Sequence, residues 1–188
     1  MEDLSARLAA NVDEAFTDLV TGHADLVFGV ALRALNDRMA AEDAAQEAFV
    51  RAYRALQRYS TERILALRLR PWLARIALNV ALNHRRSEGP AGAGLDAARS
   101  HEHPGDGPLR LAERSEEHRF WARLLGQLPE RYRLAVGLRH VECLTYPELA
   151  QALGRPLGSV KSDVHRGVAL LRAAYAAELR LIERKEAV

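Results

Sequence analysis

Apolar residues recur at helical spacing through the first 86 positions of the chain. Between Val12 and Leu35 they fall near every 3.6 positions, which predicts an amphipathic helix with a break at Gly22. A second helix is predicted from Ala40 to Tyr59, with alanines and aromatic residues on one face and charges on the other. A third is predicted from Pro71, a residue suited to a first helical turn, to about Arg86.

The pattern changes between residues 87 and 118, where glycines and prolines interrupt every apolar period. This segment is predicted to be a flexible, acidic, Gly/Pro-rich linker. Helical spacing returns near Arg119 and predicts four further helices, at Phe120–Leu128, Pro129–Glu142, Thr145–Leu153 and Leu157 to about Glu183. The predicted fold class is therefore all-α, with two small helical domains at residues 1–86 and 119–188.

The composition is typical of a globular helical protein and offers few residues for a disulfide or a metal site. Of 188 residues, 48% are hydrophobic and 28% charged, and the aromatic share of 6% favours helices over a β-sandwich. The single cysteine, Cys143, excludes an intrachain disulfide and is expected to be buried at a helix end. His101 and His103 are spaced like metal ligands but lie in the predicted linker without a nearby cysteine, so no metal or other cofactor is predicted.

The sequence also argues against an enzyme and against a secreted or membrane-spanning protein. No nucleophile, base and orienting group can be assembled from the sequence, so the protein is predicted not to be an enzyme. The N-terminus lacks the pattern of a signal peptide, and no uninterrupted apolar run approaches eighteen residues. We therefore expect a cytoplasmic protein without membrane insertion.

The net charge of +2 conceals large local imbalances. Residues 63–86 contain six arginines and no acid, and residues 119–188 contain 12 Lys and Arg against seven acids. Residues 1–62 and 87–118 are instead acidic. Two basic blocks separated by an acidic one predict two surfaces for a polyanion, the alternative being solvated helix faces.

The most informative local pattern is TYPELAQALGRPLGSVKSDVHRG, residues 145–167. Thr145 and Glu148 have the spacing of a capping box, and Gly154 is placed to end the helix that they begin. A second helix then directs valines inward and Lys161, Ser162, His165 and Arg166 outward. This layout predicts a helix-turn-helix whose second helix enters the DNA major groove. The alternative is a structural helical hairpin with solvated charges.

Asp163 departs from this basic face, because phosphates repel a carboxylate. Two roles are open for it. It accepts a hydrogen bond from a cytosine, or it holds a neighbouring arginine in place.

Taken together, three segments of the chain resemble bacterial sigma factors of the extracytoplasmic-function (ECF) group. They are AEDAAQEAFVRAYRAL, RPWLARIALNVALNHRR and LPERYRLAVGLRHVECLTYPELAQALGRPLGSVKSDVHRG, in that order. The resemblance covers about residues 12–175. It implies a protein that binds core RNA polymerase, melts the promoter −10 element with its first domain and recognises the −35 element with its second.

The resemblance also implies roles for individual residues. The implied polymerase-binding surface consists of Glu42, Asp43, Gln46, Glu47 and Arg51. The −10 element is expected to contact Arg63, Arg75, Asn79, Asn83 and Arg86, whereas Trp72 is expected in the core. The −35 element is expected to contact Arg155, Ser159, Lys161, Ser162, His165 and Arg166.

The match has departures that bear on promoter choice. The loop YSTERILALRLR, residues 59–70, is longer and more aliphatic than is usual in the family, the acid usual near Asn83 is missing, and Asp163 stands where an arginine is common. The family further implies an anti-sigma protein as a partner. Two other functions remain open from the residues: a stand-alone helix-turn-helix transcriptional regulator, and a helical enzyme or metal protein with an incidental hairpin.

Overall fold

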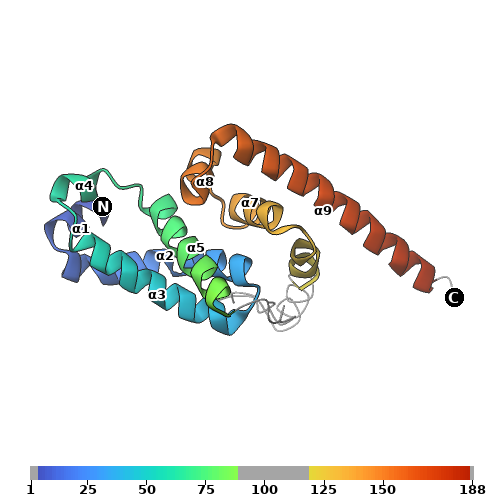
Figure 1. Ribbon diagram of the computed structural model, residues 1–188, viewed down its shortest axis with the longest axis horizontal. Coiled ribbons are helices and arrows are strands. Elements are labelled where there is room, and N and C mark those ends of the chain that lie inside the picture. The colour runs from blue at the N-terminus through green and yellow to red at the C-terminus, as the bar shows by residue number, and fades with distance from the viewer. Residues whose placement is uncertain (1–3, 89–118, 187–188) are drawn as a thin grey trace, which may run out of the picture.

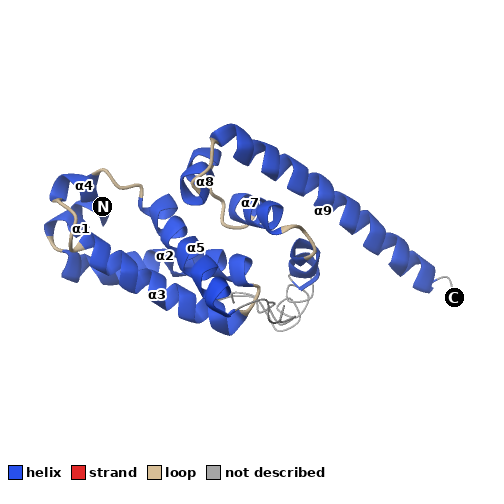
Figure 2. Cartoon of the chain, in the orientation of Figure 1, coloured by secondary structure: helices blue, strands red, loops and turns tan. Residues whose placement is uncertain are grey.

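The computed structural model describes residues 4–88 and 119–186, with side chains described for 4–87 and 119–180. Every regular element in these two ranges is a helix (Figure 2). The first range is called here the first unit and the second range the second unit. The all-α fold class predicted from the sequence is confirmed.

The first unit is a bundle built around three long helices. They are α2 (Val12–Leu35), α3 (Arg38–Leu56) and α5 (Leu69–Glu88), with the short helices α1 (Leu4–Ala10) and α4 (Thr61–Leu65) packed at one end (Figure 1). Asn11 and Asp37 cap α2 and α3 by accepting hydrogen bonds from backbone N–H groups in the first turn. The inner faces are rich in alanine, which lets the helix axes approach closely.

One helical prediction for this unit is wrong, and two short helices were missed. The predicted break at Gly22 is wrong, because α2 runs through Gly22 without interruption from Val12 to Leu35. A glycine inside a helix costs only about 1 kcal/mol relative to alanine, less than the burial of Leu19 and Val27 on either side contributes. The helices α1 and α4 were not predicted, because five to seven residues are too few to show a period.

By length and composition alone, α2 is apolar enough to cross a membrane. Its hydrophobic residues have another explanation in this fold. Leu19, Val27 and Val30 are fully buried, and α2 packs against both α3 and α5. The helix is therefore the central core element of the first unit.

The second unit contains a helical segment at 119–126 followed by α7 (Glu130–His140), α8 (Tyr146–Leu153) and α9 (Leu157–Glu186). The first half of α9 packs on α7 and α8, and its second half projects beyond the rest of the molecule (Figure 1). These bounds agree with the four predicted helices to within a few residues at each end. The predicted linker begins inside α5, which continues to Glu88; its remaining residues lie outside the described ranges.

The two units lie against each other, which the sequence did not indicate. Helix α8 packs on α5 and α7 packs on α2, as the middle of Figure 1 shows. Buried residues of both units, such as Val30, Leu73, Leu138 and Leu149, form one continuous hydrophobic core. The molecule is therefore closed, with its two units in direct contact.

Of two expectations about single residues, the one for Cys143 is wrong and the one for Trp72 is confirmed. Cys143 is exposed rather than buried, because it sits in the turn after α7 with a left-handed φ of 54°. The neighbouring Leu144 takes the buried position. Trp72 is partly buried and packs against the core, as expected from its spacing.

Candidate nucleic-acid and docking surfaces

The helix-turn-helix predicted at 145–167 is formed by α8, a short turn and the start of α9. The capping box is present: the Glu148 backbone N–H donates to Thr145 Oγ1 (3.4 Å), and the Thr145 backbone N–H donates to Glu148 Oε2 (2.8 Å). Gly154 ends α8 at φ 63°, a conformation that favours glycine. Local sequence thus determines both ends of α8 and the direction in which α9 starts.

The start of α9 separates its buried and exposed residues as a recognition helix requires. Val160 and Val164 are buried against α7 and α8. The predicted contact residues on the other face are all exposed: Ser159, Lys161, Ser162, His165 and Arg166. This face carries hydrogen-bond donors and positive charge without an exposed acid, which suits major-groove edges and phosphates.

Asp163 is fully buried, so it does not face a groove. Its carboxylate accepts hydrogen bonds from Arg131 of α7 (2.5 Å) and from Arg155 of the turn. Burial acts to raise the pKa of Asp163, but these two hydrogen bonds and the charges behind them outweigh it, and the pKa lies below its usual value. Of the two roles left open, the second is therefore correct: Asp163 holds arginines in place.

This contact distinguishes Arg155 from the other residues predicted to contact the −35 element. Arg155 is partly buried and tied to Asp163, whereas the other five residues of the set are exposed. Arg131, the second partner of Asp163, was missed by sequence reasoning. Its distance of 32 residues from Asp163 leaves no local signal.

The first unit presents a second basic and polar face along α5. Arg75, Asn79, Asn83 and Arg86 are exposed and recur at intervals of four, four and three, so they lie on one side of the helix. Leu73, Ala77 and Val80 occupy the opposite, buried side. The amides and guanidinium groups therefore form a continuous strip that a single nucleic-acid strand could follow.

Arg63, the fifth predicted −10 residue, lies apart from that strip. It belongs to α4, and its guanidinium carbon stands 3.7 Å from the centroid of the Tyr59 ring. The Tyr59 ring lies 6.3 Å from the Trp72 ring. The 59–70 segment, expected as a loop, contains α4, which is capped by Ser60 and anchored by buried Ile64, and the first two residues of α5.

The outer face of α3 carries the predicted docking residues. Glu42, Asp43, Gln46 and Arg51 are exposed, and Glu47 is partly so. Glu47 pairs with Arg51 (2.5 Å) and with His84 of α5 (2.6 Å), and the His84 hydrogen bond is the main cause of its lowered pKa. The face is therefore charged, and Glu47 is held by Arg51 of its own helix and by His84 of α5.

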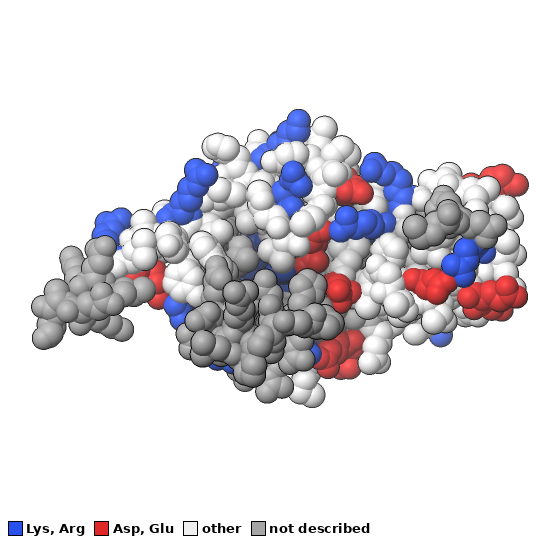
Figure 3. Space-filling model, turned by 180° about the vertical axis from the view of Figure 1, so that it is seen from behind, with Lys and Arg blue, Asp and Glu red and all other residues white. Residues whose placement is uncertain are grey.

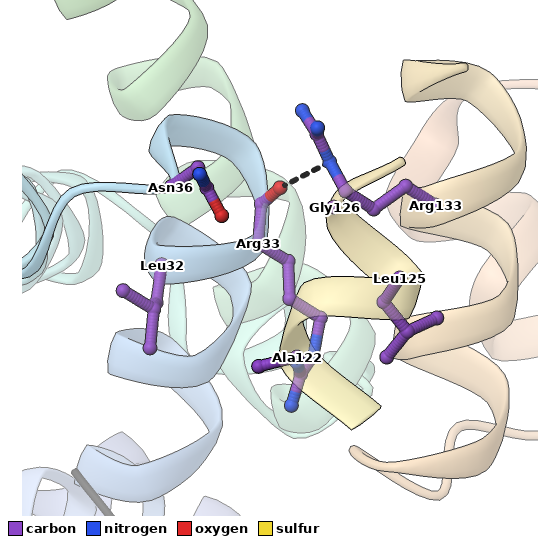
Figure 4. A pocket seen from close by; sticks show the side chains of 7 residues that line it. All are labelled: Leu32, Arg33, Asn36, Ala122, Leu125, Gly126 and Arg133. Carbon is purple, nitrogen blue, oxygen red and sulfur yellow. Dashed lines mark hydrogen bonds between the residues drawn. The ribbon is translucent and has the colours of Figure 1, made fainter. Parts of the chain in front are cut away.

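A small pocket opens where the two units meet. Its lining comes from the end of α2, the 119–126 helix and α7, as Figure 4 shows: Leu32, Arg33, Asn36, Ala122, Leu125, Gly126 and Arg133. Arg133 Nε donates to the backbone carbonyl of Arg33 at 3.2 Å across it.

Within residues 4–88 and 119–186, no group of three His, Cys, Asp or Glu side chains could hold a metal, and His101 and His103 lie outside these ranges.

Comparison with known proteins gives a consistent result over both units. The family models for Sigma-70 region 2 and Sigma-70, region 4 match residues 19–90 and 121–171. The chain is 32% identical over 174 residues to the RNA polymerase sigma-H factor of Pseudomonas aeruginosa, covering 88% of each chain. It is 30% identical to the ECF RNA polymerase sigma factor SigW of Bacillus subtilis, covering 85% of this chain and 88% of that one.

A solved structure extends the likeness to the fold. CnrH, determined in complex with the cytosolic domain of CnrY, superposes with a TM-score of 0.65 at 26% identity, covering 93% of this chain and 96% of CnrH.

Proposed function

Because this chain belongs to the extracytoplasmic-function RNA polymerase sigma factors, we propose that its two units divide promoter recognition between them. A sigma factor directs core RNA polymerase to promoters and so starts transcription at chosen sites. The first unit is proposed to bind the polymerase and the −10 element, and the second unit to bind the −35 element. The proposed function consists of binding and positioning in the cytoplasm, and no residue is assigned a catalytic role.

The observation that carries this division is the presence of two exposed basic faces on separate units. One is the α5 strip of Arg75, Asn79, Asn83 and Arg86; the other is the start of α9 with Lys161 and Arg166. A stand-alone regulator needs only the second face. Family matches over both units favour the sigma factor over that alternative.

Melting the −10 element needs contacts that favour unpaired bases. Opening base pairs costs a few kcal/mol, which protein contacts to exposed bases must help to offset. Asn79 and Asn83 have amide donors and acceptors suited to base edges, and the flanking arginines can neutralise phosphates. We assign Asn79 and Asn83 to base contacts and Arg63, Arg75 and Arg86 to the backbone.

The outer face of α3 is proposed to bind core polymerase. Charges at the rim of an interface set orientation and partner choice more than affinity, which suits a subunit that must dissociate. A regulatory partner is also proposed. The complex of CnrH with the cytosolic domain of CnrY supports a second protein that binds this fold, and an anti-sigma protein is the partner that the family implies.

Run-off transcription with purified core polymerase tests the proposal. We expect the chain plus core to start transcription from a subset of promoters in a genomic fragment library, and neither component to do so alone. In a gel-shift assay, the free chain should retard promoter DNA poorly and the holoenzyme should retard it well. Tight, specific retardation by the free chain, with no polymerase-dependent transcripts, would instead establish a stand-alone regulator.

A further inference from the structure

Ion pairs are frequent in this protein and do not by themselves indicate a functional site. Arg33 pairs with Glu142 at 2.9 Å. Arg123 pairs with Glu178 at 2.8 Å. On the face shown in Figure 3, basic and acidic side chains lie next to one another across the middle of the molecule. Exposed pairs contribute little to stability, so a pair is informative only when it joins surfaces that have separate roles.

The hydrogen bond between Glu47 and His84 joins two such surfaces. Glu47 belongs to the outer face of α3, which is proposed above to bind core polymerase. His84 belongs to α5, where it directly follows Asn83 of the strip proposed to contact the −10 element. His84 Nε2 lies 2.6 Å from Glu47 Oε2. The resemblance to ECF sigma factors draws every docking residue from α3, so it assigns no role to His84.

The Glu47 carboxylate is held at both of its oxygens. Oε1 accepts a hydrogen bond from Arg51, and Oε2 is bonded to His84. The His84 hydrogen bond is the main cause of the lowered pKa of Glu47, so the carboxylate is ionised at neutral pH and can only accept. Nε2 of His84 is therefore the donor. Two hydrogen bonds from different directions fix both the position and the plane of the carboxylate.

Glu47 stands in the middle of a row of charged residues on α3. Asp43, Glu47 and Arg51 recur every four positions, so their side chains lie one above another along the helix. Because Arg51 shares the Glu47 carboxylate, the orientation of Glu47 also sets that of Arg51. The Glu47 and Arg51 side chains are 36% and 43% exposed, against 28% for His84. His84 thus supports the row from the side and leaves both charges accessible to a partner.

This support matters because long charged side chains lose rotamer freedom when they bind. That loss opposes association, and a side chain already held in its bound orientation loses less. The pair within α3, Glu47 with Arg51, is exposed and therefore weak by itself. The bond to His84 comes from a less exposed ring on a helix that packs against α3. It adds a restraint that α3 alone lacks.

We propose that His84 is a positioning residue for core polymerase, which by donating to Glu47 holds Glu47 and Arg51 in the orientation in which α3 docks. This inference rests on the docking role proposed above for α3. His84 acts through Glu47 and is not itself placed at the contact. Helix α5 then serves both surfaces, with Asn83 and Arg86 directed to DNA and His84 directed to the docking face.

Fluorescence anisotropy of the labelled full chain with core polymerase tests the proposal. His84→Leu removes the donor, and we expect the Kd for core polymerase to rise about three- to tenfold as Glu47 and Arg51 regain rotamer freedom. His84→Gln keeps an N–H donor near the place of Nε2, so its Kd should stay within about twofold of the wild-type value. An unchanged Kd in His84→Leu, or an equal loss in both variants, would overturn the proposal.

Ser87→Ala is the matched control. Ser87 follows His84 on α5 and bonds to the His84 backbone carbonyl rather than to Glu47. Its replacement should leave the Kd at the wild-type value. Urea unfolding of every variant shows which chains are folded under the assay conditions, and His84→Gln keeps the test decisive if His84→Leu does not fold.

A double-mutant cycle separates positioning from general support of the bundle. If His84 acts through Glu47, adding His84→Leu to a Glu47→Ala chain should leave the Kd of that chain unchanged. A further loss of similar size in the Glu47→Ala chain would show that His84 acts by another route, and would overturn the proposal.

Failure of the function proposed above has a different signature. If Glu47→Ala binds core polymerase as tightly as the wild type and run-off transcription proceeds, the sigma-factor function stands and the role of His84 is refuted. If the wild-type chain neither binds core polymerase nor supports transcription, the proposed function is refuted, and the role of His84 with it.

Discussion

At the scale of single residues, an ionic contact organises the second unit from inside. Asp163 lies beneath the exposed face of α9 and binds Arg131 from α7 and Arg155 from the turn. Because Asp163 is buried, its single carboxylate orients both arginines. The exposed neighbours Lys161, Ser162 and Arg166 are thereby presented on a helix whose start is fixed.

Asp163→Asn should reduce the acid sensitivity of folding. The folded-state pKa of Asp163 is depressed, so its stabilising contribution is complete above the unfolded pKa of about 3.9 and is lost as the pH falls through the folded value. The free energy of unfolding, measured by urea titration at a series of pH values, should therefore fall less steeply below about pH 5 in the variant. At neutral pH the variant should be less stable by about 1–3 kcal/mol.

Asp43→Asn provides the control for this titration. Asp43 is exposed on α3, so its replacement should leave the free energy of unfolding nearly unchanged. If the Asp163 and Asp43 variants have the same profile, the two-arginine contact does not contribute to folding.

Arg166→Ala is expected to weaken promoter binding in a way that depends on the −35 sequence. An arginine that reads a base contributes about 1–3 kcal/mol and specifies that position. Holoenzyme binding to a panel of single-base −35 variants measures both quantities. Arg172→Ala, an exposed arginine further along α9, should lose neither. A uniform loss over the whole panel would identify Arg166 as a phosphate contact.

At the scale of helices, each exposed face is fixed by the residues on the opposite side. Helix α3 buries Ala41, Ala44, Ala45, Ala48 and Ala52. Their small side chains let α3 lie close to α2 and α5, and the acidic face is then directed outward. Helix α8 is positioned by its capping box and by the left-handed Gly154. Helix α5 places its polar strip in the same way, opposite its buried leucines and alanines.

Replacing Asp43 and Gln46 of α3 together by alanine should weaken core polymerase binding by about 1 kcal/mol or more. Glu47 is left unchanged because it is bonded to His84 and Arg51, so its loss would disturb packing as well as docking. Fluorescence anisotropy of the labelled chain with core polymerase measures the affinity. Glu14→Ala, on the exposed side of α2, is the control. Unchanged affinity in the α3 variant would place the docking surface elsewhere.

At the scale of the whole molecule, the arrangement of charge implies strong salt dependence. Neutralised phosphates release counterions, so the logarithm of the binding constant falls with the logarithm of salt concentration. Arg75→Ala and Arg86→Ala should each reduce the slope for holoenzyme binding to promoter DNA by about 0.7–0.9. Arg58→Ala, exposed but outside the basic segment, should not. Parallel salt titrations of the four proteins make the comparison, and equal slopes would contradict the phosphate role.

Much of the second unit could be predicted from the sequence because its signals are local. The spacing of Thr145 and Glu148 sets the start of α8, and Gly154 sets its end, through hydrogen bonds and backbone angles within a few residues. The helical spacing that predicted buried positions for Val160 and Val164 also predicted which face of α9 is exposed. The short helices α1 and α4 were not predictable in this way, because five to seven residues show no period and α1 is held by packing on α2 and α4.

The sequence by itself determined the helical class, the two basic faces and the family, since helix periodicity, capping and residue order are all written along the chain. The tertiary structure alone decided what Asp163 binds, that Cys143 is exposed, and that Arg33 meets Glu142 across 109 positions. Partners that far apart leave no spacing to detect. Their pairing depends on how two helical surfaces fit together, which is settled only when the units are in contact.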